Sequence, residues 1–158
     1  MPLRLRVTVA GAKVLDRALS RFGDDIKDFR EVWRRIYADF ISIEKKQFET
    51  EGGRGGLRWV PLSPSYAEWK MKHYPGKTIL DLTGELRRQM TTGAGMEVVY
   101  LPLTLSMQPT VQRAYWHHEG VGRLPARKVV WLTESDKVNW IKMVHEYVRM
   151  AIHRGGLD

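Results

Sequence analysis

The sequence lacks cysteine altogether, which excludes disulfide bonds and metal sites built on thiolates. The absence is typical of a protein made in a reducing cytosol. No uncharged run approaches the roughly 18 residues that a membrane-spanning helix needs, and Arg4 and Arg6 interrupt the only early apolar stretch. We therefore expect neither a membrane segment nor a signal peptide. With 158 residues, 43% of them hydrophobic, the chain can bury the core of one soluble domain.

Acidic side chains are scarce relative to basic ones, with 18 Asp and Glu against 26 Lys and Arg, and the net charge is +8. Residues 52–133 carry 11 basic and 5 acidic side chains, so most of the excess lies in the middle of the chain. A basic surface can serve nucleic acid, an acidic partner protein or solubility alone. The charge by itself favours none of the three.

The run from Asp24 to Glu49 predicts one long helix. Its large apolar residues are separated by steps of three and four, which places them on one side of a helix; they are Ile26, Phe29, Trp33, Ile36, Phe40 and Ile43. Such a helix would be roughly 37 Å long, whereas a compact domain of this length has a radius of gyration of about 15 Å. The stripe is expected either to cover a sheet in the core or, in part, to meet a second subunit.

Shorter elements are expected around this helix. Four glycines among residues 52–56 predict a flexible loop over residues 52–58. Ser63 followed by Pro64 is a typical helix start, and Thr83 can cap another short helix at residues 84–90. The other elements expected before residue 133 are a strand at 3–9, a helix at 13–22 preceding N-cap residues Asp24 or Asp25, strands at 98–100 and 103–105, a helical turn at 114–119 and a strand at 128–132.

Thr133 and Asp136 resemble a capping box that opens a last helix at residues 134–153. Its inward stripe is expected to be Val138, Ile141, Val144, Val148 and Ile152. Because strands and helices do not alternate strictly, the sequence predicts an α+β fold. We expect a single domain in which the long N-terminal helix and the C-terminal helix pack on a small, mostly antiparallel sheet. Its parts are residues 1–23, 24–49, 52–58, 59–132 and 134–153.

No set of residues has the pattern of a catalytic, cofactor or metal site. His117 and His118 are adjacent, so on a helix their side chains point about 100° apart and do not share a face as zinc-binding histidines do. Asp81 and Glu85 are interpreted as acidic residues at a helix start. We therefore expect no enzyme activity, no cofactor and no metal.

Four segments of the middle third occur together in a recognisable order. They are 48–52 followed by 59–63 and Lys70 (FETEG, WVPLS), 79–86 (ILDLTGEL), 115–120 (YWHHEG) and 124–127 (LPAR). Together they resemble the phage virion morphogenesis family, which includes the tail completion proteins of Mu-like and related tailed phages. The resemblance covers roughly residues 20–153, most of the chain.

The resemblance implies a structural protein of a phage or prophage, made in the host bacterial cytoplasm and placed in the virion at the tail or neck. It implies a role in tail completion and head–tail joining. Relatives resemble neck proteins that form six-fold rings. The partners implied are therefore copies of this chain, a portal or adaptor ring, tail tube or tail terminator proteins, and non-specific DNA in the lumen.

Tryptophan and arginine are enriched in interface cores, so the candidate subunit or partner contacts are Trp59, Trp69, Arg87, Arg88, Trp116, Arg123, Arg127 and Trp131. Arg127 leaves two alternatives open, a carboxylate partner within its own domain or a contact between subunits. The competing function is a basic nucleic-acid-binding domain. No helix rich in Arg, Asn and Gln indicates sequence-specific reading of bases.

Overall fold

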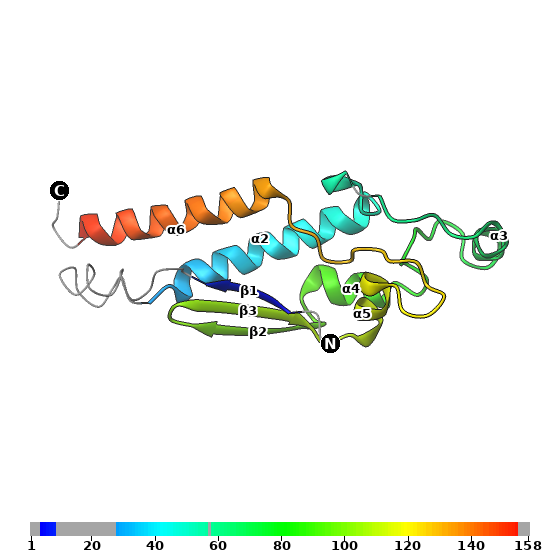
Figure 1. Ribbon diagram of the computed structural model, residues 1–158, viewed down its shortest axis with the longest axis horizontal. Helices are drawn as coiled ribbons and strands as arrows, with labels where there is room; N and C mark the ends of the chain where they lie inside the picture. The colour runs from blue at the N-terminus through cyan, green and yellow to red at the C-terminus, as the bar shows by residue number, and fades with distance from the viewer. Residues whose placement is uncertain (1–3, 9–27, 57, 155–158) are drawn as a thin grey trace. The chain divides into compact units, whose positions relative to one another are not determined.

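The computed structural model describes residues 4–8, 28–56 and 58–154. Within them the chain forms five α-helices, one 3₁₀ helix and one three-stranded antiparallel sheet (Figure 1), which confirms the predicted α+β fold. The expected helix at 13–22, the expected N-cap residues and Ile26 lie outside the described residues. Contacts divide the chain into two compact units. Unit 1 consists mainly of residues 40–97 and 109–132, and unit 2 of residues 4–39, 98–108 and 133–158.

The sheet joins β1 (Leu5–Thr8), β2 (Met96–Leu101) and β3 (Thr104–Pro109) in the order β1-β3-β2. β1 pairs antiparallel with β3 in a register that sets Leu5 opposite Met107 and Val7 opposite Leu105. Because side chains alternate between the faces of a strand, Leu105 and Met107 are both buried while their neighbours are partly exposed. The strands predicted at 3–9, 98–100 and 103–105 are thus confirmed, with small shifts of their ends.

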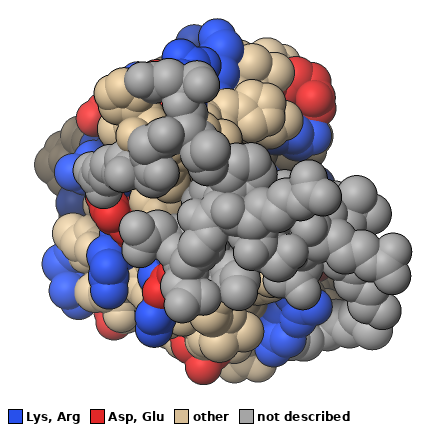
Figure 2. Space-filling model, turned by 90° about the vertical axis from the view of Figure 1, so that its left-hand side faces the viewer, with Lys and Arg blue, Asp and Glu red and all other residues tan. Residues whose placement is uncertain are grey.

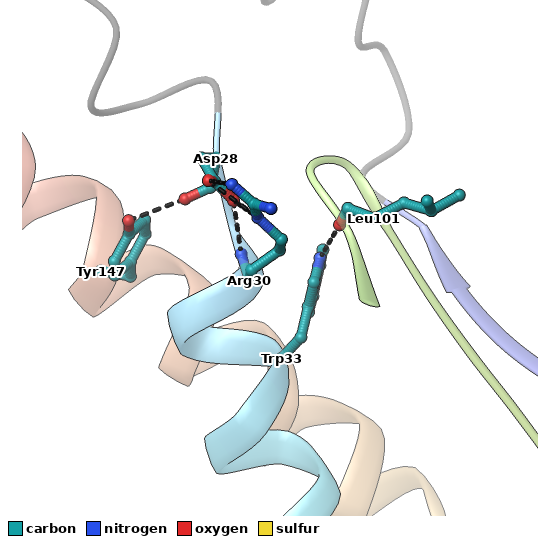
Figure 3. A network of polar contacts seen from close by, with 5 residues as sticks. All are labelled: Asp28, Arg30, Trp33, Leu101 and Tyr147. Atoms are coloured by element: carbon teal, nitrogen blue, oxygen red, sulfur yellow. Dashed lines mark hydrogen bonds and ion pairs between the residues drawn. The ribbon is translucent and has the colours of Figure 1, made fainter. Parts of the chain in front are cut away.

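The long helix, α2 (Arg30–Glu49), begins later than Asp24. The main-chain N–H of Phe29 donates to the carbonyl of Pro102 in the β2–β3 turn (2.8 Å). The carboxylate of Asp28 then accepts a hydrogen bond from the N–H of Arg30 (3.0 Å), one of the N–H groups that a helix start leaves free, and also binds the Arg30 guanidinium (Figure 3). Asp28 therefore stabilises the helix start that Asp24 or Asp25 was expected to provide.

The apolar stripe of α2 is confirmed from Phe29 to Ile43, because each of its large residues in that span is buried. Within unit 2, Trp33 also donates its indole N–H to the carbonyl of Leu101 at the end of β2 (3.0 Å; Figure 3). The N-terminal half of α2 is therefore fixed to the sheet by both apolar packing and a hydrogen bond.

The last helix, α6 (Glu134–Arg154), starts with the predicted capping box. The N–H and hydroxyl of Thr133 each donate to the Asp136 carboxylate (2.7 Å), and the N–H of Asp136 donates to the Thr133 hydroxyl oxygen (3.2 Å). Within unit 2, α6 runs antiparallel beside the N-terminal half of α2 (Figure 1). None of the described helices is long and apolar enough to cross a membrane.

The predicted inward stripe of α6 is wrong in its first half. Val138 and Ile141 are 48% and 53% exposed, whereas Trp140 is 4% exposed and faces α2. Tyr147 likewise donates its hydroxyl to the carbonyl of Asp28 (2.8 Å; Figure 3). The larger aromatic side chains on the neighbouring face bury more surface than valine and isoleucine, and they decide which way the helix is rotated.

Unit 1 contains α3 (Pro64–His73), α4 (Glu85–Thr92), α5 (Gln112–Glu119) and the 3₁₀ helix η2 (Gly53–Gly55). The three short α-helices confirm the helix predicted after Ser63, the helix predicted at 84–90 and the helical turn predicted at 114–119, with shifted ends. The N-cap of α4 is Gly84, so the cap expected from Thr83 is wrong. They surround a core whose buried members are Phe48, Trp59, Leu86, Met90, Ala114 and Val129. The segment over residues 52–58 includes η2, from which Arg54 donates to the carbonyl of Trp131 (3.1 Å).

The strand predicted at 128–132 is wrong, because these residues form an irregular segment. The carbonyl of Lys128 accepts side-chain hydrogen bonds from Gln47 (2.8 Å) and from the indole of Trp59 (2.9 Å). These side chains satisfy a main-chain group that a strand would pair with another strand.

Candidate functional site

A cavity of about 650 Å³ lies entirely within unit 1. Its walls come from the chain before α3 and the first turns of that helix, from residues 80–86, from α5, and from residues 123–127. Apolar side chains provide much of the lining, among them Leu62, Leu82 and Leu124. The chain thus brings together at one place residues that are separated by up to 66 positions in sequence, from Pro61 to Arg127.

These walls coincide with segments that carry the family resemblance. Leu62 and Ser63 belong to the first segment, residues 80–86 to the second, His117 to the third and residues 124–127 to the fourth. The fold therefore accounts for the occurrence of the four motifs together, because each motif contributes to the same cavity.

Arg127 is the most buried of the predicted contact residues at this cavity, with 5% of its surface exposed. Its Nε donates to the carbonyl of Val60 (2.8 Å) and its terminal nitrogen to the carbonyl of Pro61 (3.2 Å). Burial lowers the pKa of the guanidinium. The sequence left two alternatives for Arg127, a carboxylate partner in its own domain or a contact with another subunit. Its hydrogen bonds lie within unit 1, but their acceptors are main-chain carbonyls and not the expected carboxylate.

Lys70 of α3 is a second buried cation on the same cavity, with 4% exposed. Its Nζ donates to the carbonyl of Thr78, and burial is the main cause that lowers its pKa. The carboxylate of Asp81 opposes that effect and the positive charge of Arg127 adds to it. Two like charges are therefore held close enough to influence each other.

Asp81 is a buried carboxylate at the cavity, 5% exposed. Its two oxygens pair with Lys77 and Arg87, each at 3.4 Å. The helix α4 begins at Glu85 with Gly84 as its N-cap, so the interpretation as a helix-start acid is wrong for Asp81, although it holds for Glu85 in the first turn. Arg87, one of the predicted contact residues, is thus partly engaged in holding the segment before α4.

His117 of α5 also lines the cavity, and its Nδ1 is buried with no hydrogen-bond partner among the described residues. Burial, together with the positive charges of Arg127 and Arg113, lowers the pKa of His117. Both effects favour the neutral form of the imidazole. Its main-chain carbonyl accepts from the N–H of Arg127 (2.7 Å), which fixes α5 against the segment that carries that arginine.

An exposed aromatic cluster adjoins the cavity on α3. The ring of Trp69 stacks on Tyr66 (centroids 5.5 Å apart) and on His73 (5.0 Å), and lies near Tyr74 (5.7 Å). Trp69 remains 42% exposed, and Tyr66 both lines the cavity and belongs to this cluster. Stacked aromatic rings that are ordered yet accessible are typical of protein interfaces.

The other predicted contact residues are distributed differently. Arg123 is exposed at the rim of the cavity, and Trp116 is 38% exposed and lines a smaller hollow of about 400 Å³ shared with Arg113. Arg88 is exposed on α4 and Trp131 is half-buried. Trp59 is 3% exposed and packs edge-on against Phe48, so it serves the core of unit 1.

Sequence reasoning did not select Lys70, Tyr66 or Arg113 as site residues. Lys70 was part of the first motif, and its place on the same helix face as Tyr66, four residues earlier, is the only signal that pointed to it. Arg113 stands outside every motif. Among residues 4–8, 28–56 and 58–154, no three histidine, aspartate or glutamate side chains gather in a way that would hold a metal ion.

Comparison with family models gives one match. The model of the phage virion morphogenesis family matches residues 11–149, which is nearly the whole chain. The chain belongs to the phage virion morphogenesis family. Comparisons with curated proteins and with solved structures give no significant match.

Membership of the phage virion morphogenesis family makes this chain a component of phage particle morphogenesis. The segments quoted for the resemblance fall inside the matched region, and so does every residue of the cavity. The cavity and the aromatic cluster beside it are therefore the features to be explained in terms of particle assembly.

Proposed function

We propose that this protein completes the tail and joins it to the head, assembling as a six-fold ring at the neck of the particle and catalysing no reaction. Family membership supplies the particle role. The role in tail completion and ring assembly is supported by the convergence of four motif segments on one cavity. The polar groups of this cavity include types that are enriched in protein–protein interfaces. Arginine, lysine and tyrosine line it beside apolar walls.

A ring requires head-to-tail contacts, in which two different surfaces of one subunit meet their counterparts on its neighbours. Two such surfaces are present on separate units. One is the aromatic cluster of α3 in unit 1. The other is the exposed apolar pair Val138 and Ile141, one turn apart on α6 in unit 2. Both present large apolar side chains to solvent, which supports a protein that functions in association.

Nucleic-acid binding is the competing function, suggested by the net charge of +8. Figure 2 shows one face of the molecule, on which Lys and Arg side chains are interspersed with Asp and Glu. On that face, such a mixture suits contacts with proteins better than with a phosphate backbone, which attracts a continuous basic stripe. A duplex that bound the isolated protein with a steep salt dependence would favour the competing function.

The test is genetic and structural. A stop codon early in this gene should yield lysates in which electron microscopy finds filled heads and separate tails, and added purified protein should restore joined, infectious particles. Normal joined particles without the protein would contradict the proposal. A lysate of the stop-codon phage that contained no heads would place the protein at an earlier step of morphogenesis.

A further inference from the structure

The cavity of unit 1 contains a buried positive charge that the chain itself does not neutralise. Arg127 and Lys70 are both at least nine-tenths buried, and their hydrogen bonds end on main-chain carbonyls. Removing a charge from water is unfavourable unless a partner compensates it. The carboxylates of Asp81 and Glu51 act on Lys70. Carbonyl dipoles compensate the charge of Arg127 only in part, so Arg127 favours a site where an anion can approach.

The nearby carboxylates do not supply that anion for Arg127. Asp81 pairs with Lys77 and Arg87, and it acts on Lys70. Glu85 is exposed and lies 3.9 Å from Arg113. Tyr66 opposes the effect of burial on the pKa of Arg127. Among the described residues, Arg127 is therefore a buried cation without a carboxylate partner.

The unused hydrogen-bond donors of Arg127 define the chemistry of its ligand. A guanidinium carries five N–H donors, and the bonds to residues 60 and 61 use two of them. Those left match the two oxygens of a carboxylate. The leucine and proline walls favour apolar atoms next to that carboxylate. A duplex phosphate lacks such atoms and is bound by accessible cations, so it suits this cavity poorly.

We propose that this cavity is a socket for an acidic segment of another virion protein, with a glutamate or aspartate side chain bound by Arg127 and flanking apolar residues packed against the leucine and proline walls. Contacts between copies in the ring are proposed at the aromatic cluster of α3 and at α6, so we assign the socket to a different virion protein. The inference depends on the proposed function only in placing the partner in the virion.

The direct test is a comparison of two immobilised peptide pools. Both have capped ends and randomised apolar and polar flanks; one has glutamate and the other the isosteric glutamine at the centre. The full-length protein should retain the glutamate pool about tenfold better, a factor that corresponds to about 1.4 kcal/mol. Equal retention of the two pools by the folded protein overturns the proposal without any variant being needed.

Variants locate the preference. Arg127→Lys keeps the charge and loses the two-pronged geometry, so it should remove most of the tenfold difference. Arg123→Gln removes an exposed charge at the rim and should reduce retention of the glutamate pool by about fivefold while the fold is unaffected. Lys72→Gln is the matched control, since it removes an exposed charge of α3 outside the lining. A glutamate preference that Arg123→Gln and Arg127→Lys both leave intact would place binding elsewhere and overturn the proposal.

Two further outcomes separate the other occupants. Displacement of the bound peptides by a short DNA duplex at physiological salt would assign the cavity to nucleic acid. Self-association of wild type that Arg127→Lys abolishes, seen by sedimentation velocity, would assign it to a second copy; either result overturns the proposal. Failure of the stop-codon experiment would remove the virion role and leave the peptide result standing, so the two inferences fail independently.

Discussion

The indole N–H of Trp140 donates a 2.7 Å hydrogen bond to the carboxylate of Asp39, which joins α6 to the N-terminal half of α2. Trp140 is 4% exposed, so its indole is largely shielded from water. Trp140→Phe should lower the free energy of unfolding by about 1.5–3 kcal/mol, the range for a hydrogen bond to a charged group. Urea unfolding measures this loss.

Val138→Ala on the exposed face of α6 is the control for that variant. It should change the free energy of unfolding by no more than about 0.5 kcal/mol, as for most surface substitutions. A Val138→Ala loss that exceeded the Trp140→Phe loss would show that the helix is rotated as the sequence pattern first suggested.

Glu44 of α2 is fully buried and neither of its carboxylate oxygens has a hydrogen-bond partner among the described residues. Burial raises its pKa well above 4.5, although the positive charge of Arg54 opposes the effect. The unfolded chain therefore releases this proton at lower pH than the folded chain does. The contribution of Glu44 to stability is fully present below about pH 4.5 and is lost as the pH rises towards the pKa of the folded state.

Glu44→Gln should remove this pH dependence, because the amide does not titrate. At mildly alkaline pH the variant should be more stable than wild type, by about 1.4 kcal/mol for each factor of ten by which folding lowers the acid dissociation constant of Glu44. At acidic pH the two proteins should differ little in stability. Denaturant unfolding at several pH values measures both curves. Parallel curves for the two proteins would contradict the expected role of Glu44.

Gly120 ends α5 with φ +75°, and a Cβ there would lie 2.6 Å from the main-chain nitrogen of Ala126 and 2.9 Å from the carbonyl oxygen of Leu124. Gly122 has a similar φ of +69°, but a Cβ would meet nothing within 4 Å. Gly122→Ala should therefore lower the free energy of unfolding by about 1–2 kcal/mol, the cost of placing alanine in the left-handed conformation. Gly120→Ala should cost about 1–3 kcal/mol more through overpacking.

Thermal unfolding of the two glycine variants provides the comparison. Gly120→Ala should also displace the segment that carries Arg127 and so weaken retention of the glutamate peptides. Equal losses of stability in the two variants would show that the close approach between α5 and residues 124–126 is not maintained in solution.

Trp69→Ala tests the aromatic cluster of α3. Because Trp69 is 42% exposed, we expect a loss of stability below about 1.5 kcal/mol, the upper range for an aromatic pair. Its effect on particle completion should be far larger, since exposed tryptophans dominate the energy of many interfaces. Complementation of the stop-codon phage measures this, with Lys72→Ala as the control on the same helix. Full complementation by Trp69→Ala would exclude the cluster from the neck contacts.

The sequence predicts the regular elements where local chemistry decides them. The apolar stripe of α2 and the Thr133–Asp136 capping box depend on residues three or four apart, and both are confirmed. The α+β class follows from the same local signals. The strand predicted at 128–132 fails because distant side chains, Gln47 and Trp59, take the carbonyl of Lys128. No local pattern contains that information.

The candidate site shows the same limit. Arg123 and Arg127 were selected from the sequence and do lie at the cavity. Trp59 was selected for the same compositional reason but is buried in the core, because residue type alone does not distinguish an indole that packs inside from one that faces solvent. Lys70 was overlooked since its burial results from the way residues 78–81 fold over α3. Whether these residues contact other subunits stays a prediction.

The hydrogen bond from Tyr147 to Asp28 spans 119 positions along the chain. Every stretch of unit 1 ends by residue 132, whereas unit 2 also includes residues 133–158. During translation, unit 1 can acquire most of its contacts before α6 has left the ribosome, but unit 2 cannot. Long-range closure of this kind slows folding. A prematurely terminated polypeptide would present an uncovered α2 to the cytosol, and quality-control proteases would have an opportunity to remove it before it reached a growing particle.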